Sequence, residues 1–499
     1  MGEIAEVVGG GTPRTSDPAN WDPPTVAWIT PADLSGYKAK TITHGKRFIS
    51  EEGLARSGAR LMPPGTVLFS SRAPIGYVAI AAAPVATNQG FKSFVLKQGV
   101  LPDYVYYYLL GNKSLALALA SGTTFPEISG KNAAGIPFPL APFTEQKRIV
   151  EAIEAHLSRL DAAVAALERV RVNLKRYRAS VLKAACEGRL VPTEAQLARR
   201  EGRDYEPADV LLERILRERR TRWEAEELER LKAKGKPPTD DRWKQKYKEP
   251  EPLDTNELPS LPEGWTWAPL AALGELKGGI TKGFKPRAGE VHREVPYLRV
   301  ANVQRGYLDL TDVRTIRAPL EKIEALRLQP GDVLFNEGGD RDKLGRGWIW
   351  SGEIPECIHQ NHVFRARLYL PDLQPKYISW YANSAGQEYF VRQGKQTTNL
   401  ASINLTKLGS LPVALPPAAE QARIAQEIER RLSLVDSMQT ALETAGRRAE
   451  RLRHAILQHA FTGRLVPQDP NDEPASTLLE RIRARRHEQT ELAIARSAT

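Results

Sequence analysis

Few residue patterns in the sequence could support catalysis. His359 and His362 stand three positions apart with Cys357 nearby, and imidazole and thiolate groups are typical zinc ligands. A zinc site also needs a third and fourth ligand at a suitable spacing, so a strand with polar side chains is the simpler interpretation. Four Gly-Lys pairs lack the Ser or Thr that completes a phosphate-binding loop: Gly45-Lys46, Gly130-Lys131, Gly235-Lys236 and Gly394-Lys395. We predict no catalytic residue, no metal site and no cofactor bound by this chain.

Binding chemistry is better represented, in clusters of polar and basic residues that occur in two regions. In the first region these are Ser70, Ser71, Arg72, Thr87, Asn88, Gln89, Lys92, Thr123 and Thr124. In the second they are Lys282, Lys285, Arg287, Asn336, Arg341, Lys343, Arg346, Gln360, Asn361, Gln396, Thr397, Thr398 and Asn399. Arg suits guanine, Asn and Gln suit adenine, and Ser, Thr and Lys suit phosphates. Each residue alone is compatible with an ordinary wet loop, but as two parallel sets they indicate contacts with double-stranded DNA.

The composition agrees with a nucleic-acid partner. The chain has 499 residues, 41% of them apolar, and a formal net charge of +11. That length allows about three domains, and the excess of basic residues favours an anionic partner. Two cysteines cannot form a disulfide framework, and neither a membrane-spanning run nor a secretory signal is visible, so we expect a cytoplasmic protein.

A long internal repeat organises the sequence. Glu145 and Glu420 are 275 positions apart, and the same spacing relates Gly188-Arg189-Leu190-Val191-Pro192 to Gly463-Arg464-Leu465-Val466-Pro467 without a gap. No proline interrupts residues 143–190 or 418–466, so each copy predicts one long helix that ends at its glycine. A helix of about 45 residues would be about 67 Å long.

Both predicted helices carry apolar residues at coiled-coil spacing. The positions are Ile153, Leu157, Leu160, Val164 and Leu167 in the first copy, and Ile428, Leu432, Val435 and Leu442 in the second. Either each helix packs on its own domain, or the two pair with each other and act as a spacer. These apolar positions form a seam along each helix, and the two copies carry it at equivalent positions. We therefore favour pairing of the two helices, with the same residues available for docking partner subunits.

The regions before the helices are also related. Gly2-Glu3-Ile4 is similar to Gly274-Glu275-Leu276, and Pro64–Phe69 is similar to Pro330–Phe335, where Pro-Gly predicts a turn into a strand. Short apolar helices are expected from Tyr104 to Leu110 and from Tyr377 to Tyr381. The charged stretch after the first long helix is expected to be a solvated helical linker, and a short amphipathic helix follows each long one.

The arrangement resembles the specificity subunit of type I restriction-modification enzymes. The resemblance rests on two Pro-x-x-Glu-Gln-x-x-Ile helix starts, Pro142–Ile149 and Pro417–Ile424, and on the two Gly-Arg-Leu-Val-Pro helix ends. Leu261-Pro262-Glu263-Gly264-Trp265 and the linker end Lys246–Pro250 add to it. It covers essentially the whole chain.

This resemblance implies two α/β (α+β) target-recognition domains, each followed by a long coiled-coil helix, in a pseudo-twofold internal repeat with an antiparallel helix pair. Each domain would read one half of a split DNA site, and the helices would set the gap and dock two modification (methyltransferase) subunits. Restriction (translocase and nuclease) subunits would join them. S-adenosylmethionine, ATP and Mg would belong to those partners. The expected boundaries are recognition domains at 1–141 and 261–416, long helices at 142–193 and 417–467, a linker at 194–260 and a tail at 468–499.

Two alternatives stay open. The chain could be a coiled-coil scaffold that binds partner subunits without reading DNA. It could also be a remnant specificity subunit, because Leu261–Trp267 precedes Gly274 in the second half whereas the first half starts directly at Met1. Either the true start lies upstream or the first domain has a weakened first element.

Overall fold

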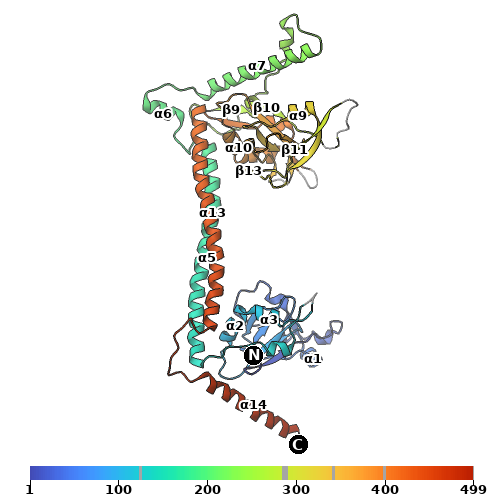
Figure 1. Cartoon of the computed structure of the whole chain (residues 1–499), viewed down its shortest axis with the longest axis vertical. Helices are drawn as coiled ribbons and strands as arrows, with labels where there is room; N and C mark the ends of the chain where they lie inside the picture. The colour runs from blue at the N-terminus through green and yellow to red at the C-terminus, as the bar shows by residue number, and fades with distance from the viewer. Residues whose placement is uncertain (123–125, 282, 284–289, 340–342, 397–400, 498–499) are drawn as a thin grey trace. The chain divides into compact units, whose positions relative to one another are not determined.

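The computed structural model of the chain describes residues 1–122, 126–281, 283, 290–339, 343–396 and 401–497 (Figure 1). The chain forms two compact units, of which the first contains Met1–Arg169 with Leu442–Thr499 and the second contains Val170–Ala441. Both units combine short strands with long helices, as the sequence predicts. No helix within the described ranges is both long enough and apolar enough to cross a membrane.

Two small sheets form the α/β domain of the first unit. Their strand orders are β1-β8-β5-β6-β3 and β4-β2-β7. The strands are β1 Ala5–Gly9, β2 Val26–Ile29, β3 Thr41–Ile42, β4 Arg47–Ile49, β5 Val67–Phe69, β6 Val78–Ala81, β7 Ala86–Thr87 and β8 Lys92–Leu96. The helices are α1 Glu51–Ala55, α2 Pro102–Gly111, α3 Lys113–Ala118 and α4 Gly130–Ala134. Val67, Phe69 and Phe94 are fully buried and mark the core of the domain.

The α/β domain of the second unit repeats this plan with additional strands. Its larger sheets have the orders β10-β19-β15-β17 and β14-β11-β18, and β22 pairs with β9. The strands are β9 Thr266–Pro269, β10 Gly274–Lys277, β11 His292–Leu298, β12 Val303–Gln304, β13 Tyr307–Leu308, β14 Arg314–Pro319, β15 Val333–Asn336, β16 Gly338–Gly339, β17 Gly347–Ile349, β18 Ile358–His359, β19 Val363–Leu368, β20 Lys395–Gln396, β21 Ala401–Ser402 and β22 Pro412–Leu415. The helices are α8 Leu270–Leu273, α9 Leu320–Leu326, α10 Pro375–Asn383, α11 Gly386–Gln393 and α12 Leu405–Gly409.

Local signals in the sequence explain several of these elements. Gly65 and Gly331 have φ values of +84° and +94°, which glycine adopts without strain, and each turn leads into a fully buried strand. The two Pro-Gly turns into β5 and β15 are therefore confirmed. The expected apolar helices are confirmed as α2 and α10, each of which begins at a proline in its first turn.

Strand register corrects one correspondence between the two halves. Val7 pairs with Phe94 and Leu276 pairs with Ala366. Because Phe94 and Ala366 are also the partners of Val67 and Val333, Val7 corresponds to Leu276. The match of Gly2-Glu3-Ile4 to Gly274-Glu275-Leu276 is thus wrong by three residues. Short Gly-Glu matches carry too little information to fix a strand register.

The charged stretch after the first long helix is not simply solvated, and this prediction was wrong for its first half. It contains α6 Glu194–Glu201 and α7 Ala208–Ala233. Leu211 and Ile215 of α7 are fully buried in the core of the second domain. Further along, Trp223 of α7 stacks on Trp243, with ring centroids 6.1 Å apart. This part of α7 therefore also packs against the chain that follows it.

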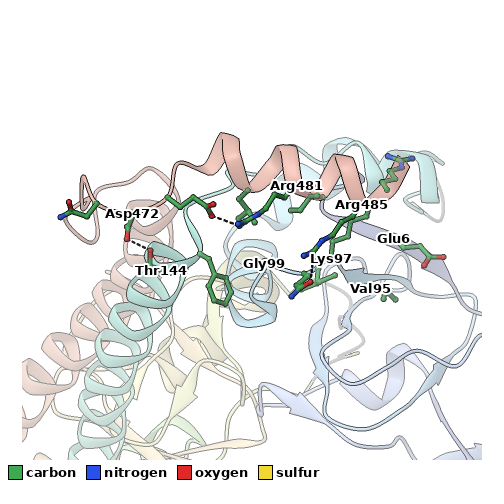
Figure 2. Close-up of a pocket in the computed structure, with 16 residues that line it drawn as sticks. Glu6, Val95, Lys97, Gly99, Thr144, Asp472, Arg481 and Arg485 are labelled. Atoms are coloured by element: carbon green, nitrogen blue, oxygen red, sulfur yellow. Dashed lines mark hydrogen bonds and ion pairs between the residues drawn. The ribbon is translucent and has the colours of Figure 1, made fainter. Parts of the chain in front are cut away.

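The last helix, α14 Ala475–Ser497, packs in the same way on the first domain. Leu478 and Ile482 lie in the core of that domain, and Figure 2 shows α14 passing over the loop at Lys97 and Gly99. An added Cβ at Gly99 would come within 2.5 Å of Leu478 Cδ1, so glycine at this position permits the close approach. Near the start of the tail, Asp472 Oδ2 accepts a hydrogen bond of 2.6 Å from Arg148 Nη2.

The two long helices are α5 Phe143–Cys186 and α13 Ala418–Phe461, and each contributes to both units. Gly188 and Gly463, with φ of +66° and +70°, follow their ends. In the first unit Asp161 pairs with Arg453, and in the second Arg178 pairs with Asp436 at 2.8 Å. Each unit therefore contains an ion pair between α5 and α13.

Most of the seam residues are covered. Ile153, Leu157, Ile428, Leu432 and Val435 are buried. Leu160, Leu167 and Leu442 are half-buried. Val164 is 36% exposed. Leu174 and Val181 continue the heptad spacing of α5 and are buried.

The packing of α7 can be tested by truncating one buried side chain. Ile215→Ala should lower the free energy of unfolding by about 2–5 kcal/mol, because it leaves a cavity in the second domain. Val210→Ala, on the same helix but 43% exposed, should change it by less than about 0.5 kcal/mol. Urea denaturation followed by tryptophan fluorescence measures both. Equal effects of the two substitutions would contradict the packing of α7 on the domain.

Candidate nucleic-acid interface

In the first domain, four segments meet at the ends of strands. The loop after β5 bonds to the loop before β8 through Ser71 N and Gly90 O, which are 2.7 Å apart. Ile128 N donates to Ser71 O at 3.0 Å, and Gly11 N donates to Thr87 O at 2.9 Å. These main-chain bonds fix four surface segments beside one another, whatever their side chains are.

The second domain forms the same bonds at the corresponding positions. Glu337 N donates to His362 O at 3.0 Å, and Ile403 N donates to Glu337 O at 2.9 Å. Ile280 N donates to His359 O at 2.8 Å, as Gly11 does to Thr87 in the first domain. Each domain therefore presents one four-segment site, which we call the loop site.

In the first loop site, two predicted cations meet at one carboxylate. Arg72 Nη1 lies 3.3 Å from Glu127 Oε2, and Lys92 Nζ lies 3.5 Å from Glu127 Oε1. Arg72 is 39% exposed at its side chain, so its guanidinium is available to a ligand. Sequence reasoning missed Glu127, because its partner Arg72 is 55 positions away in the chain.

The second loop site has a different charge pattern. Here the exposed His362 Nδ1 contacts Glu337 Oε2, and Asn361 Nδ2 lies 3.4 Å from His362 Nε2. Gln360 and Asn361 are half-buried beside this pair, as Asn88 and the exposed Gln89 are in the first site. An imidazole next to a carboxylate offers both donors and acceptors, whereas the first site offers mostly donors.

Four residues predicted to contact DNA are buried instead. Ser70, Ser71, Thr87 and Asn336 are fully buried. Ser70 Oγ donates to Pro74 O at 2.7 Å and accepts from Tyr77 N at 2.8 Å. Asn336 Nδ2 donates to Val303 O at 2.8 Å. Their assignment as direct contacts was wrong, because these side chains are buried, and two of them, Ser70 and Asn336, bond to the main chain.

The remaining predicted residues are placed as follows. Arg346 Nη2 donates to Val300 O at 3.3 Å, and Lys343 is half-buried in the same loop. The main chain of Gln396 forms part of β20, but its side chain is not described by the structure. Nine predicted residues lie outside the described residues: Thr123, Thr124, Lys282, Lys285, Arg287, Arg341, Thr397, Thr398 and Asn399.

An aromatic and basic cluster next to the first loop site was also missed. The Arg47 guanidinium lies 4.0 Å from the centroid of the Trp21 ring and 5.3 Å from that of Trp28. Trp28 Nε1 donates to Gly11 O at 3.0 Å, which connects the cluster to the loop site. The signal available in the sequence was two tryptophans followed by Lys46-Arg47. Such a cation–π group suits contact with a polyanion that also offers flat rings.

His359, the candidate zinc ligand, is buried under the second loop site. Its Nδ1 lies 2.6 Å from Val363 O, and none of the described residues forms a hydrogen bond with its Nε2. Burial, together with the nearby Arg365 guanidinium, lowers the pKa of His359 to about 4. Among the residues that the structure describes, no three His, Cys, Asp or Glu side chains gather in a way that could hold a metal ion.

Comparison with known proteins identifies the family. Residues 1–169 match the family model of the type I restriction modification DNA specificity domain. The EcoKI specificity subunit of Escherichia coli K12 is 24% identical over 90% of this chain and 88% of that relative. Residues 1–169 therefore match a type I restriction modification DNA specificity domain, and most of the chain is similar to type I restriction enzyme specificity subunits.

Two further matches agree with this family of specificity subunits. The MjaIX specificity subunit of Methanocaldococcus jannaschii is 41% identical over 150 residues, which is 30% of this chain and 34% of that relative. A solved chain of a type I R-M system, 18% identical, superposes over 93% of this chain and 96% of its own length with a TM-score of 0.57. The structural match supports the fold.

The buried state of His359 predicts a pH dependence of stability. Its pKa is 6.5 in the unfolded chain and about 4 in the folded one, so the folded state binds its proton less readily. The contribution of neutral His359 to the stability of the folded state is complete above pH 6.5 and is lost as the pH falls towards 4. At pH 5 the free energy of unfolding should be lower by about 2 kcal/mol. Urea denaturation at pH 7.5 and pH 5.0 measures this loss.

The matched control is a histidine at the surface. His359→Gln should reduce the difference in the free energy of unfolding between pH 7.5 and pH 5.0 by about 2 kcal/mol. The side chain of His362 is half exposed, so His362→Gln should leave most of that difference unchanged. An unchanged pH dependence in His359→Gln would contradict a buried neutral imidazole.

Proposed function

We propose that this chain is the DNA-reading subunit of a type I restriction-modification complex, and that each α/β domain reads one half of a split site. The observation that carries the proposal is the loop site, built twice with the same main-chain hydrogen bonds on a chain of net charge +11. A basic chain that presents two such sites suits a duplex, which carries a negative charge at each phosphate.

The two loop sites share a frame and differ in their side chains, which supports reading of two unlike half-sites. Ser71 in the first corresponds to Glu337 in the second, and Gly90 corresponds to His362. Since Arg favours guanine and a carboxylate favours the amino group of cytosine, Arg72 and Glu337 would select different bases. Polar residues predicted in both sites, such as Gln89 and Asn361, suit adenine.

We further propose that the chain is a pseudo-twofold repeat in which α5 and α13 form an antiparallel coiled coil that sets the gap between half-sites. Supporting this, each helix has 44 residues and contributes to both units. The ion pairs Asp161–Arg453 and Arg178–Asp436 follow one common register. Half-sites on one face of DNA are about one turn, or roughly 34 Å, apart, which is within the length of such helices.

Partner subunits would dock on the outer surface of these helices. Several large apolar side chains of these helices are exposed, and a bound subunit would cover them. They are Val170, Val172, Tyr177, Leu434, Met438 and Leu452. We propose that two modification subunits bind here and carry S-adenosylmethionine, that restriction subunits carry ATP and Mg, and that this chain is itself non-catalytic and works in the cytoplasm.

The decisive test lengthens both helices by one heptad, which keeps the seam in phase. Seven residues inserted after Ala163, with seven more after Glu450 on the facing helix, add about 10 Å, the length of about three base pairs. We expect the gap of the recognised site to lengthen and both half-sites to stay the same. Genome-wide mapping of methylated adenine, in a host that carries the neighbouring subunit genes, measures both.

Deletion of this chain is the control for the mapping and should remove the split motif entirely. A shift in the bases of a half-site, with the gap unchanged, would contradict the spacer role. A methylation pattern that survives deletion of the chain would contradict DNA reading and favour a scaffold that binds only partner subunits.

A second prediction concerns the exposed cation of the first loop site. If Arg72 contacts a phosphate instead of a base, Arg72→Ala should flatten the slope of log K against log salt by about 0.9, whereas a change in the preferred sequence would mark Arg72 as a base reader. Arg199→Ala removes a more exposed arginine, 67% against 39% for Arg72, which is also paired with a glutamate, Glu263, and it should leave the slope unchanged. Fluorescence anisotropy with a DNA duplex over 50–200 mM salt, a range chosen to follow the expected change, gives both slopes. Equal slopes in all three proteins would contradict a phosphate contact at Arg72.

A further inference from the structure

The helix α14 presents a stripe of residues to the first domain that begins apolar and becomes basic. Leu478 and Ile482 of this helix are buried in the core of the domain. Arg481, Arg485 and Arg486 stand three, seven and eight positions after Leu478, which places them on the same helix face. The side of α14 that packs on the domain therefore carries guanidinium groups beyond the core.

A cavity of about 820 Å³ lies beside this stripe, within the first unit. It is bounded by the end of β8 and the loop at Lys97, by the start of α5 at Phe143, and by α14. Figure 2 shows Arg485 extending from α14 toward Lys97. Ligand cavities in proteins usually measure about 300–1,000 Å³ and combine apolar walls with a few polar groups. This cavity has both, because Leu478 and Ile482 line it together with the arginines.

The cavity is separate from the first loop site. In the antiparallel pair of β1 and β8, Gly9 lies opposite Lys92, and Ala5 lies opposite Leu96. Lys92 stands at the loop-site end, where it approaches Glu127, whereas Leu96 lines the cavity. Four residues of a strand span about 13 Å, so the two sites lie at opposite ends of the same strands. They can therefore hold different ligands.

Two cations at this cavity lack a carboxylate partner. Arg485 Nη1 donates to Gln98 Oε1, which is neutral, and none of the described carboxylates forms an ion pair with Arg485 or Lys97. The carboxylates that line the cavity each pair with an arginine already: Glu6 with Arg60, Asp472 with Arg148, and Glu473 with Arg481.

Lys97 therefore stands among like charges. Burial, together with the Arg486 guanidinium, holds the pKa of Lys97 below its usual value, and Glu6 offsets this only in part. Cations that share a partly buried cavity repel one another, and an anion between them would replace this repulsion by attraction.

We propose that this cavity binds the terminal phosphate of a nucleotide, with Lys97, Arg485 and Arg486 around the phosphate. A terminal phosphate carries about two negative charges and three acceptor oxygens, so it matches several cations better than a carboxylate with one charge. The Phe143 ring lines the same cavity and is 38% exposed, which makes it available to a flat base. A free nucleotide and the 5′-phosphate end of a nucleic acid strand share this chemistry. The site does not depend on DNA reading by the loop sites.

The test titrates inorganic pyrophosphate into the full chain by isothermal titration calorimetry. We expect one saturable site at neutral pH. Lys97→Met and Arg485→Met should each weaken binding by about tenfold or more, because each removes a charge-assisted hydrogen bond. Arg159→Gln, at an exposed position of α5 in the same unit, is the matched control and should leave binding unchanged.

Thermal denaturation separates a binding role of Lys97 from a structural one. Without ligand, Lys97→Met should maintain or raise the melting temperature, since it removes one of several like charges. Pyrophosphate should raise the melting temperature of the unchanged chain and not that of Lys97→Met. Absence of saturable binding, unchanged binding in both variants, or a lower melting temperature in Lys97→Met would overturn the proposal. A tetra-aspartate peptide that binds more tightly than pyrophosphate would overturn the assignment to phosphate and favour an acidic protein segment.

Two further ligands distinguish the sources of the phosphate, and either result supports the proposal. Adenosine diphosphate that binds more tightly than pyrophosphate, with a gain that Phe143→Leu removes, would identify a free nucleotide. A 5′-phosphorylated oligonucleotide that binds more tightly than the same strand without its phosphate, with a difference that Lys97→Met removes, would identify a strand end. Because the second comparison is a difference between two strands, binding of either strand at the loop sites cancels.

Discussion

The pairing of α5 with α13 is the constraint on which the rest of the structure depends. A helix of 44 residues with apolar side chains at heptad spacing must bury that seam, and a small α/β domain can cover only one end of it. In each unit the helix end that packs on the domain also packs on the other helix: Ile149 and Ile153 share a cluster with Tyr104 and Leu457. The position of each domain on its helix and the pairing of the helices are therefore fixed by one set of contacts.

The loop sites show how one fold can carry two different polar surfaces. Main-chain bonds such as Ser71 N to Gly90 O, and Glu337 N to His362 O, do not depend on side-chain type. The frame therefore tolerates serine or glutamate at one position, and glycine or histidine at the next. Buried polar side chains support this frame from below, as Ser70 does through Pro74 and Tyr77. The surface can change without loss of the scaffold.

Local signals made much of the fold predictable from the sequence. The Pro-Gly turns at Gly65 and Gly331 and the two long helices depend on neighbouring residues and on periodicity, and the structure contains all of them. What failed depends on distant contacts. Residue type alone could not show that Ser70 and Asn336 face inward, because their partners are main-chain groups brought close by the fold. Glu127 and the Trp21–Arg47 cluster were missed for the same reason, since each joins segments that are well separated in the sequence.

The composition of the two units has a consequence for how the protein is made. The second unit is one continuous stretch, Val170–Ala441, but the first combines Met1–Arg169 with Leu442–Thr499. During synthesis the second unit can complete its core while the first still lacks Leu457, Leu478 and Ile482. The N-terminal domain, although it is synthesised before the second unit, can therefore complete its core only after the second unit has been made and residues up to Ile482 have left the ribosome.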